Sequence, residues 1–432
     1  MGGPSASAGI SPYDRLCWPE AQLQQALATG QHAHELRAWF GRGEYEALVG
    51  LAQLAAAASR RAGTPRVYLL PGIMGSQLGR PRAEGPPDLL WMDPQDIQQG
   101  RLVELGPEGP ALMPLGGIPF SYLPLKLRLV AQGFDVTVFD YDWRRDLGDA
   151  ATRLAQRLDE ETGPVALIGH SMGGLLARAT LPLTAARVEH VILLGTPGRG
   201  AVAAAQALRA TYPAVCRLAA LDSMHDVEQL TAAAFRHFAS LYQLLPQAAV
   251  HGGVDVFDPA QWPTDSPPPD AGLLAAASRF VHSLPPADAR HTAIIGTGQR
   301  TATAFRHWQG QFQYDITSLG DGTVAAAAAQ LDAGRNHYLR CEHSQLPRHP
   351  TVAAAISELL QQGRTRRLAS RWRGSSTPPT QVSDHQLRRS LHRKVDWSTL
   401  TATARREYFN RLNRPPPLYR TARRPPRLAV KT

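Results

Sequence analysis

The chain has 432 residues, of which 43% are hydrophobic and 19% are charged. This length exceeds the roughly 100–200 residues of one ordinary domain, and the apolar content suffices for a sizeable core, so small scaffolds and wholly disordered chains are excluded. Neither a bilayer-spanning apolar run nor an export signal is recognised. Cys17, Cys216 and Cys341 are odd in number and far apart, which argues against a disulfide framework. We therefore expect a globular, cytoplasmic protein.

The formal net charge of +10 is concentrated in the last part of the chain. Residues 364–432 hold 18 Lys and Arg against Asp384, Asp396 and Glu407, a net of +15, so residues 1–363 carry a net of −5. An argument for a polyanion or a membrane surface therefore applies to the tail alone. We expect a Pro- and Arg-rich, largely disordered tail that can contact an anionic membrane peripherally, and we expect no nucleic-acid partner.

The first elements in chain order are helical. After a Gly/Ser-rich leader, Leu, Ala and Trp recur near helical spacing from Ala21 to Arg60, which predicts helices. From Arg66 the pattern changes to short β-rich runs that alternate with helical stretches, which is typical of parallel βα units. The first such runs are Arg66–Leu70, Val136–Tyr141, Val165–Gly169 and Val188–Leu194.

The segment from Ala201 to Arg290 is rich in Ala and Leu and lacks such runs, so we interpret it as an inserted helical cap. The βα pattern resumes at His291–Gly296 and His337–Cys341, and it ends in a helix from Thr351 to Leu360 that Gly363 stops. The sequence thus predicts an α/β fold with a mostly parallel central sheet flanked by helices. The expected divisions are 1–60 (leader and helices), 61–200 (first part of the core), 201–290 (cap), 291–363 (second part of the core) and 364–432 (tail).

The strongest chemical signal is the segment Gly169-His170-Ser171-Met172-Gly173, which lies between an apolar strand and a helix. A nucleophilic serine projects from a sharp strand-to-helix turn, and the two glycines keep side chains away from that turn. The helix directs unpaired N–H groups to the same spot, so we expect the amide of Met172 to stabilise an oxyanion. Ser171 is the candidate nucleophile, and a Gly-rich turn with an idle serine is the alternative.

A serine nucleophile needs a base and an orienting acid, which follow it in the order Asp or Glu, then His, in folds with this turn. Asp321 lies in a Gly-Asp-Gly segment after Ser171, and His343 follows the next predicted strand. His343 is therefore the candidate base and Asp321 the candidate acid. An ordinary Asp-Gly turn is the alternative for Asp321, and His337 and His349 are the alternatives to His343.

The second half of an oxyanion hole is expected in a loop after an early strand. The apolar run Val67–Leu70 ends in a Gly-rich turn, Pro71-Gly72-Ile73-Met74-Gly75. Its exposed amides can face an acyl oxygen, and the amide of Ile73 is the best candidate. An ordinary βα turn is the alternative.

Met74, Trp143 and Tyr242 are candidate substrate contacts. For Trp143 the alternative is a buried structural role beside an Asp142–Arg144 pair. Tyr242 belongs to an apolar stripe of the cap that either lines an acyl tunnel or packs the cap on the body. The stripe consists of Phe235, Leu241, Tyr242, Leu244 and Leu245.

At these residues the sequence resembles the lecithin:cholesterol acyltransferase family of α/β hydrolases. The matching motifs are Leu70-Pro71-Gly72-Ile73-Met74-Gly75-Ser76, Tyr141-Asp142-Trp143-Arg144, Gly169-His170-Ser171-Met172-Gly173-Gly174, Gly195-Thr196-Pro197 with Gly200, and Gly320-Asp321-Gly322-Thr323-Val324 followed by His343. The match spans about Arg66 to Leu360 and leaves residues 1–60 and 364–432 unexplained. Unlike the secreted animal members, with their disulfides and lid, this sequence shows no export signal.

The resemblance implies an α/β-hydrolase fold and a Ser-Asp-His enzyme that acts on acyl esters of lipids, as a lipase, a phospholipase or an O-acyltransferase. Ser171 would be the nucleophile, Asp321 the acid and His343 the base, with the amides of Ile73 and Met172 as the oxyanion hole. The expected partner is an acyl-lipid or ester substrate, and no metal or organic cofactor is expected. The alternative is an inactive hydrolase-fold protein that binds lipid or polyanion through its basic tail.

Overall fold

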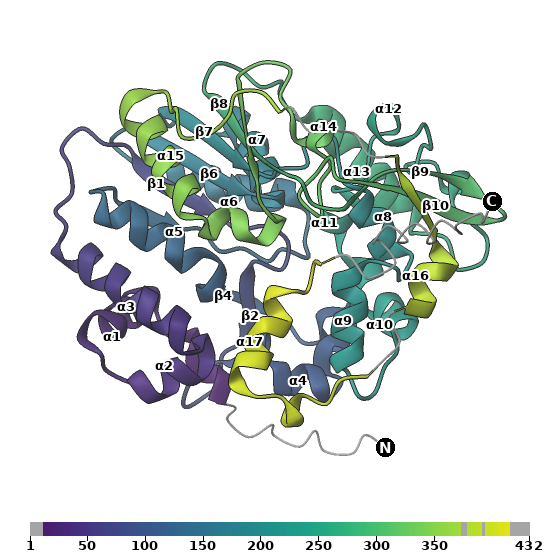
Figure 1. Cartoon of the computed structure of the whole chain (residues 1–432), viewed down its shortest axis with the longest axis horizontal. Helices are drawn as coiled ribbons and strands as arrows, with labels where there is room; N and C mark the ends of the chain where they lie inside the picture. Colours follow the sequence, from purple (N-terminus) through teal and green to yellow (C-terminus); the bar gives the residue numbers. More distant parts are fainter. Residues whose placement is uncertain (1–11, 373–377, 391–393, 415–432) are drawn as a thin grey trace, which may run out of the picture.

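The computed structural model describes residues 12–372, 378–390 and 394–414. The strands of its central sheet are β1 (Arg66–Leu70), β5 (Val136–Val138), β6 (Val165–His170), β7 (Val188–Leu194), β8 (His291–Thr297) and β11 (Arg335–Arg340). They lie in the order β11-β8-β7-β6-β1-β5, and every pairing is parallel (Figure 1). The predicted parallel sheet is therefore confirmed. The strand expected to reach Tyr141 ends at Val138, because its neighbour β1 turns away at Pro71, which has no N–H to extend the ladder.

Helices cover both faces of this sheet (Figure 1). They are α5 (Pro119–Ala131) and α15 (Pro350–Gln362) on one face, and α6 (Leu147–Asp159) and α7 (Met172–Thr180) on the other. Successive side chains of a strand point to opposite faces, so Leu69 packs in the cluster of α5 and α15, whereas Leu70 packs in that of α6 and α7. The helix predicted to stop at Gly363 is α15, and Gly363 follows it with φ +67°.

Residues 201–290 are all described, and they contain helices and turns but no strand, which confirms the helical character predicted for them. The division of the chain into the predicted segments stays a prediction. The helices are α8 (Val202–Leu208), α9 (Pro213–Leu221), α10 (Val227–Ala233), α11 (Ala239–Tyr242), α12 (Ala248–His251) and α13 (Ala271–Ser283). Within the described ranges, no helix combines the length and the apolarity that crossing a bilayer requires.

The remaining elements surround this core. The N-terminal helices pack on α5 through a cluster that includes Leu123 and Leu127. These helices are α1 (Glu20–Thr29), α2 (Ala33–Phe40) and α3 (Arg42–Ala57). Two small antiparallel sheets are formed by β2 (Ser76–Arg80), β3 (Asp88–Trp91) and β4 (Met113–Gly117), and by β9 (Thr301–Trp308), β10 (Gln311–Thr317) and β12 (Thr380–Ser383). Short helices α4 (Pro94–Gln98) and α14 (Ala326–Ala329) complete the body.

The described part of the basic tail is folded, so the expectation of a largely disordered tail is wrong for it. Strand β12 pairs with β10, and helices α16 (Asp384–Ser390) and α17 (Ala402–Asn410) follow. The reason is that Leu387, Trp397 and Leu412 are buried in the main apolar cluster, a contribution that the basic composition conceals. The predicted leader at 1–11 and residues 373–377, 391–393 and 415–432 lie outside the described residues.

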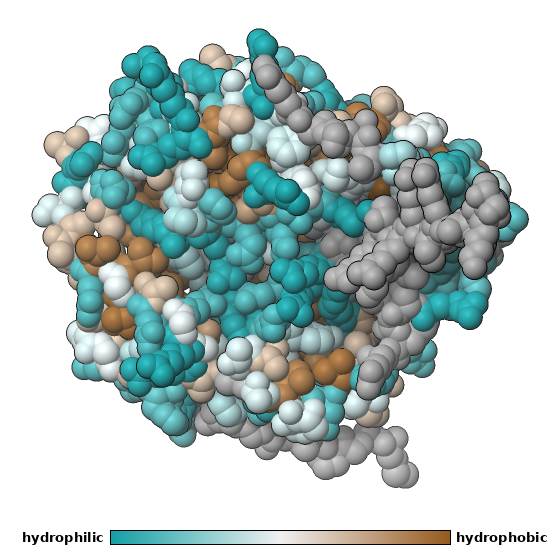
Figure 2. Space-filling model, viewed as in Figure 1, coloured by the Kyte–Doolittle hydropathy of each residue, from teal (hydrophilic) through white to brown (hydrophobic). Residues whose placement is uncertain are grey.

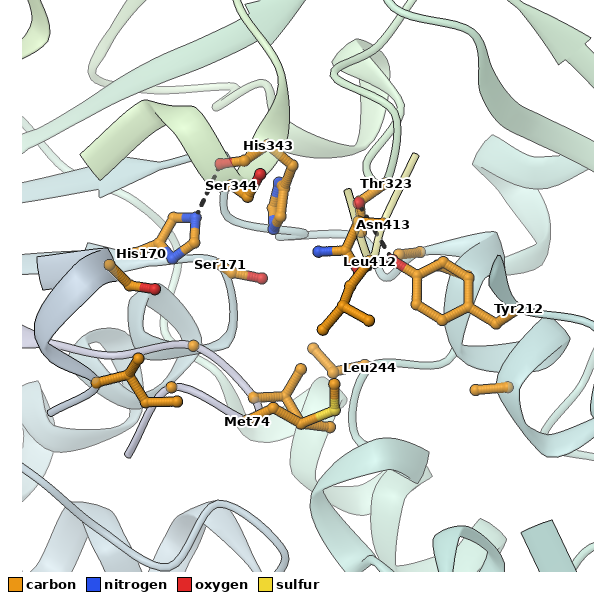
Figure 3. Close-up of a pocket in the computed structure, with 18 of the residues that line it drawn as sticks. Met74, His170, Ser171, Tyr212, Leu244, Thr323, His343, Ser344, Leu412 and Asn413 are labelled. Carbon is orange, nitrogen blue, oxygen red and sulfur yellow. Dashed lines mark hydrogen bonds between the residues drawn. The ribbon is translucent and has the colours of Figure 1, made fainter. Parts of the chain in front are cut away.

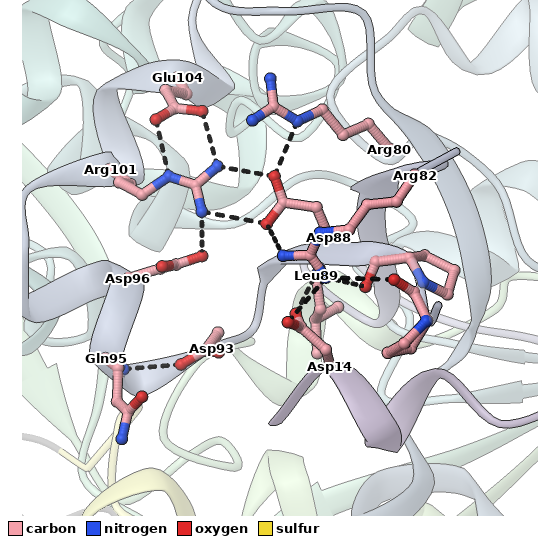
Figure 4. Close-up of polar contacts among 12 residues, drawn as sticks. Asp14, Arg80, Arg82, Asp88, Leu89, Asp93, Gln95, Asp96, Arg101 and Glu104 are labelled. Carbon is pink, nitrogen blue, oxygen red and sulfur yellow. Dashed lines mark hydrogen bonds and ion pairs between the residues drawn. The ribbon is translucent and has the colours of Figure 1, made fainter. Parts of the chain in front are cut away.

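A buried ion-pair cluster holds β3 against its surroundings (Figure 4). The carboxylate of Asp88 accepts from Arg80 Nε at 2.7 Å, from Arg82 Nη2 at 3.1 Å and from Arg101 Nη2 at 3.1 Å. Burial acts to raise the pKa of Asp88, but the hydrogen bonds and charges of Arg101 and Arg80 outweigh it, and the pKa lies below its usual value. Arg101 also pairs with Asp96 at 2.5 Å, so one guanidinium serves two buried carboxylates.

Arg101→Met should lower the free energy of unfolding by about 3 kcal/mol at pH 7, because it leaves buried carboxylates without the cation that they share. Urea unfolding measures this loss. The matched control is Arg157→Met, which removes an exposed ion pair with Glu160 and should cost less than about 1 kcal/mol. Equal, small losses in both variants would contradict the importance of the cluster.

Candidate active site

Ser171 occupies a sharp turn between β6 and α7. Its φ and ψ are +54° and −124°, a conformation that residues other than glycine rarely adopt, and its N–H donates to the carbonyl of Leu194 at 2.8 Å. The turn leaves no room for side chains after it: a Cβ on Gly173 would lie 2.1 Å from the Leu70 oxygen, and one on Gly174 would lie 1.9 Å from Thr196 Oγ1. The turn therefore presents Ser171 at the carboxyl edge of the sheet.

The side chains of Asp321 and His343 are joined by a hydrogen bond of 2.6 Å between Oδ2 and Nδ1. The other carboxylate oxygen of Asp321 accepts from the backbone N–H groups of Thr323 at 3.0 Å and Val324 at 2.7 Å. The N–H of His343 also donates to the carbonyl of Asp321 at 2.8 Å. A carboxylate can only accept at Oδ2, so Nδ1 carries a proton and Nε2 of a neutral His343 is left as an acceptor.

The two alternative histidines lie elsewhere. His337 is buried within β11, away from Asp321. His349 precedes α15, where its Nδ1 accepts from the N–H of Thr351 at 3.2 Å and so caps the helix. Of the three histidines, only His343 is paired with Asp321 in the described structure.

Ser171 and His343 line one cavity of about 170 Å³, far above the roughly 10–15 Å³ that a single water molecule needs. Figure 3 shows the ring of His343 pointing toward Ser171. Ile73 and Met74, from the loop after β1, line the same cavity. Met172 is the first residue of α7, so its N–H has no partner within the helix. The structure thus brings together all the candidate catalytic and oxyanion residues.

Two of the three candidate substrate contacts do not line this cavity. Trp143 is fully buried, its Nε1 donates to the carbonyl of Ser76 at 2.9 Å, and its ring packs edge-on against Trp91 and Phe238. Tyr242 is also buried, with its hydroxyl bonded to a backbone carbonyl of the cap. Both side chains point into the core instead. From the apolar stripe of the cap, the cavity is lined by Phe235, Leu241 and Leu244, but not by Tyr242 or Leu245.

Sequence reasoning missed a buried network that joins three loops of the site. The N–H of Gly72 donates to the Tyr122 hydroxyl at 2.9 Å, and this hydroxyl lies 3.0 Å from His170 Nδ1. On the other side of the ring, His170 Nε2 lies 3.1 Å from the carbonyl oxygen of His343 (Figure 3). The sequence offered a partial signal, because Gly72 lies in the predicted oxyanion loop and His170 precedes the candidate nucleophile. Tyr122 had no such signal, because it lies far from both in the chain, on α5.

The donor and the acceptor of each hydrogen bond in this network can be assigned, starting from the carbonyl of His343. The carbonyl of His343 can only accept, so His170 Nε2 carries a proton. Burial and the neighbouring His343 lower the pKa of His170 to about 3, which keeps the ring neutral and Nδ1 unprotonated. The Tyr122 hydroxyl must then donate to Nδ1 while it accepts from Gly72. Every hydrogen bond in the chain from the β1 loop to the His343 loop therefore has a defined direction.

Sheet, turn and acid–base pair together define the chain as a protein of the α/β-hydrolase fold. A sequence profile of the lecithin:cholesterol acyltransferase family matches residues 129–356, which is more than half of the chain. The chain therefore belongs to this family, as its motifs predict. Its general activity is hydrolysis of the acyl esters of lipids or transfer of their acyl groups. No curated protein matches the chain.

Solved structures similar to this chain include lipases. The mature Bacillus licheniformis lipase BlEst2 is 16% identical over 70% of this chain and 94% of its own, with a TM-score of 0.36. Its propeptide form is 15% identical over 70% and 51%, with a TM-score of 0.38. A structure of the Tle4–Tli4 complex is 15% identical over 72% of this chain and 100% of the matched chain, with a TM-score of 0.43.

Because His170 is neutral when folded but titrates near its ordinary pKa when unfolded, the unfolded state binds more protons between about pH 6 and pH 4. Stability must therefore fall as the pH decreases through this window. His170→Gln should reduce the slope of unfolding free energy against pH by about 1.4 kcal/mol per pH unit there. Urea unfolding at several pH values measures it, with exposed His282→Gln as the control. Identical slopes for wild type and His170→Gln would contradict a buried neutral ring.

Proposed function

We propose that this chain is a serine-dependent enzyme that transfers the acyl group of a lipid ester, through an acyl-enzyme, to water or to an alcohol. The observation that carries the proposal is the pairing of His343 with Asp321 at 2.6 Å, beside a cavity that Ser171 also lines. Buried acid, base and hydroxyl are the groups that such a reaction needs, in the order in which hydrolases of this fold carry them.

In the first half of the proposed reaction, Ser171 Oγ attacks the ester carbonyl while Nε2 of His343 takes its proton. The amides of Ile73 and Met172 hold the oxyanion that forms on the carbonyl oxygen. The bond to the leaving alcohol then breaks, and His343 returns the proton to the alcohol oxygen. The buried Asp321 carboxylate keeps Nδ1 protonated and stabilises the imidazolium.

In the second half, water or an acceptor alcohol attacks the acyl-enzyme, and His343 takes its proton. The bond between Ser171 Oγ and the acyl carbon then breaks, and the proton returns to Ser171. Hydrolysis and transfer differ only in this acceptor, so one set of groups supports a lipase, a phospholipase or an O-acyltransferase. The apolar side chains of Met74, Leu241 and Leu244 in the cavity suit the aliphatic part of an acyl chain.

Labelling with a fluorophosphonate probe tests the proposal. Wild type should be labelled, and Ser171→Ala and His343→Ala should lose labelling and at least about 10³-fold of the hydrolysis of p-nitrophenyl esters. Ser344→Ala and His349→Ala are matched controls, because they remove a neighbouring serine and histidine, and should stay within about threefold of wild type. A folded wild type that is neither labelled nor active, even with lipid micelles, would contradict the enzyme and favour a binding protein.

Tyr122 is assigned as a positioning residue of the same site, acting through Gly72 and His170. Tyr122→Phe should lower kcat about tenfold with KM within twofold, because the oxyanion loop and the His343 loop lose their common tie. The double variant with His170→Gln should lose little more than either single variant. Tyr68→Phe, which removes a hydroxyl bonded to Glu161 instead, is the control. Additive losses, or a change confined to KM, would contradict the positioning role.

A further inference from the structure

We propose that residues 394–414, called here the C-terminal segment, form one wall of the acyl-chain site, and that Leu412 limits the length of the acyl chain. This inference rests on the proposed function, since it assigns the specificity of the same cavity. Neither the basic composition of the tail nor the family match, which ends at residue 356, assigns such a role.

Side chains of the C-terminal segment enter the cavity directly. Phe409 and Leu412 line it together with Ser171 and His343, and Leu412 is only 9% exposed. Figure 3 shows the side chain of Leu412 extending into the space between Ser171 and Leu244. An acyl chain attached to Ser171 would therefore meet Leu412 inside the cavity.

The backbone around Leu412 is held by the cap. The guanidinium of Arg217, from α9, donates to the Leu412 carbonyl, and the Tyr212 hydroxyl donates to Asn413 Oδ1 at 3.2 Å. Burial raises the pKa of Tyr212 to about 12, so its hydroxyl keeps the proton that it donates. These two contacts hold the backbone that carries Leu412 against α9 and the residue before it.

Helix α17 is anchored beside the cavity, which its Phe409 lines. Arg406, only 7% exposed, bonds Glu44 at 2.9 Å, and its guanidinium lies 3.9 Å from the ring centre of Phe120, which itself lines the cavity. Arg348, which follows the candidate base in the chain, donates to Asn410 at 2.9 Å. These contacts join the C-terminal segment to α3, α5 and the His343 loop.

The other end of the C-terminal segment is tied to the end of α9. Lys394 Nζ donates to the carbonyls of Ala219, Asp222 and His225 at 2.9, 2.6 and 2.6 Å. Trp397 is buried against α17. Figure 1 shows α17 crossing the front of the molecule beside α2 and α4, and Figure 2 shows that this face is mainly hydrophilic, with scattered hydrophobic residues. Anchored at both ends, the segment forms a wall rather than a loose tail.

The space beyond Leu412 is also apolar. The ring of Tyr212, the residue before α9, lies on the side of Leu412 away from Ser171 (Figure 3), and Val215 of α9 lines the same cavity. A smaller residue at this position would extend the cavity toward α9, and a larger one would shorten it. The ligand class is an aliphatic acyl chain, because Leu244, Val215 and Phe409 present hydrocarbon to the same cavity as Leu412.

The test compares kcat/KM for p-nitrophenyl butyrate, octanoate and dodecanoate in wild type, Leu412→Ala and Leu412→Trp. The dodecanoate-to-butyrate ratio should rise about tenfold in Leu412→Ala and fall about tenfold in Leu412→Trp, since a few methylene groups in a pocket discriminate on that scale. The ratio is internal to each variant, so a reduced folded fraction cancels. Leu400→Ala, which trims a leucine of the same segment that packs on the core outside the cavity, should leave the ratio within twofold.

The proposed role of Leu412 would be overturned if the dodecanoate-to-butyrate ratio stayed within twofold in both Leu412 variants. It would also be overturned if the ratio shifted equally in Leu400→Ala. A wild type that cleaves no ester contradicts the proposed function. The limit on chain length at Leu412 is then tested by the binding of fatty acids. Displacement of a fluorescent fatty acid by butyric, octanoic and dodecanoic acids should show Leu412→Ala favouring the longest acid and Leu412→Trp the shortest, each about tenfold. Unchanged preferences in that assay would overturn the inference independently of catalysis.

Discussion

The site depends on a close approach of backbones at the turn that carries Ser171. A Cβ on Gly173 would lie 2.1 Å from the Leu70 oxygen, and one on Gly72 would lie 2.9 Å from Ser171 Cβ. The end of β1 and the start of α7 can therefore meet only through glycine, and their meeting places the oxyanion loop beside the nucleophile. The positive φ of Ser171 is tolerated because these neighbours over-determine the turn.

The other loops of the site are tied to this turn through His170. The loops after β1, β6 and β11 all leave the sheet at its carboxyl edge, where open α/β sheets bind their ligands. A neutral His170 joins them, because it accepts from Tyr122 on one side and donates to the His343 carbonyl on the other. His170, which lies between Gly169 and Ser171, thus links the candidate nucleophile to the loop that carries the candidate base, His343.

Local patterns were sufficient to predict the parallel strands and to single out Ser171, Asp321 and His343 as candidates, because apolar runs and Gly-rich turns indicate their own conformation. They were insufficient wherever burial depends on distant partners. Trp143 turns into the core to reach Ser76, and Tyr122 meets a histidine 48 positions away. Leu412 lies in a basic stretch of the chain. The average charge of this stretch does not reveal that a few of its apolar side chains are buried in the main apolar cluster.

In the proposed reaction, Ser171 carries the acyl group between donor and acceptor. Rapid mixing with p-nitrophenyl butyrate, acid quenching within the first turnover and mass spectrometry of the intact chain and its peptides test it most directly. We expect one butyryl group, on the peptide that contains Ser171, and its disappearance on longer incubation. Ester cleavage without any acylated chain, or with the butyryl group on another residue, would contradict it.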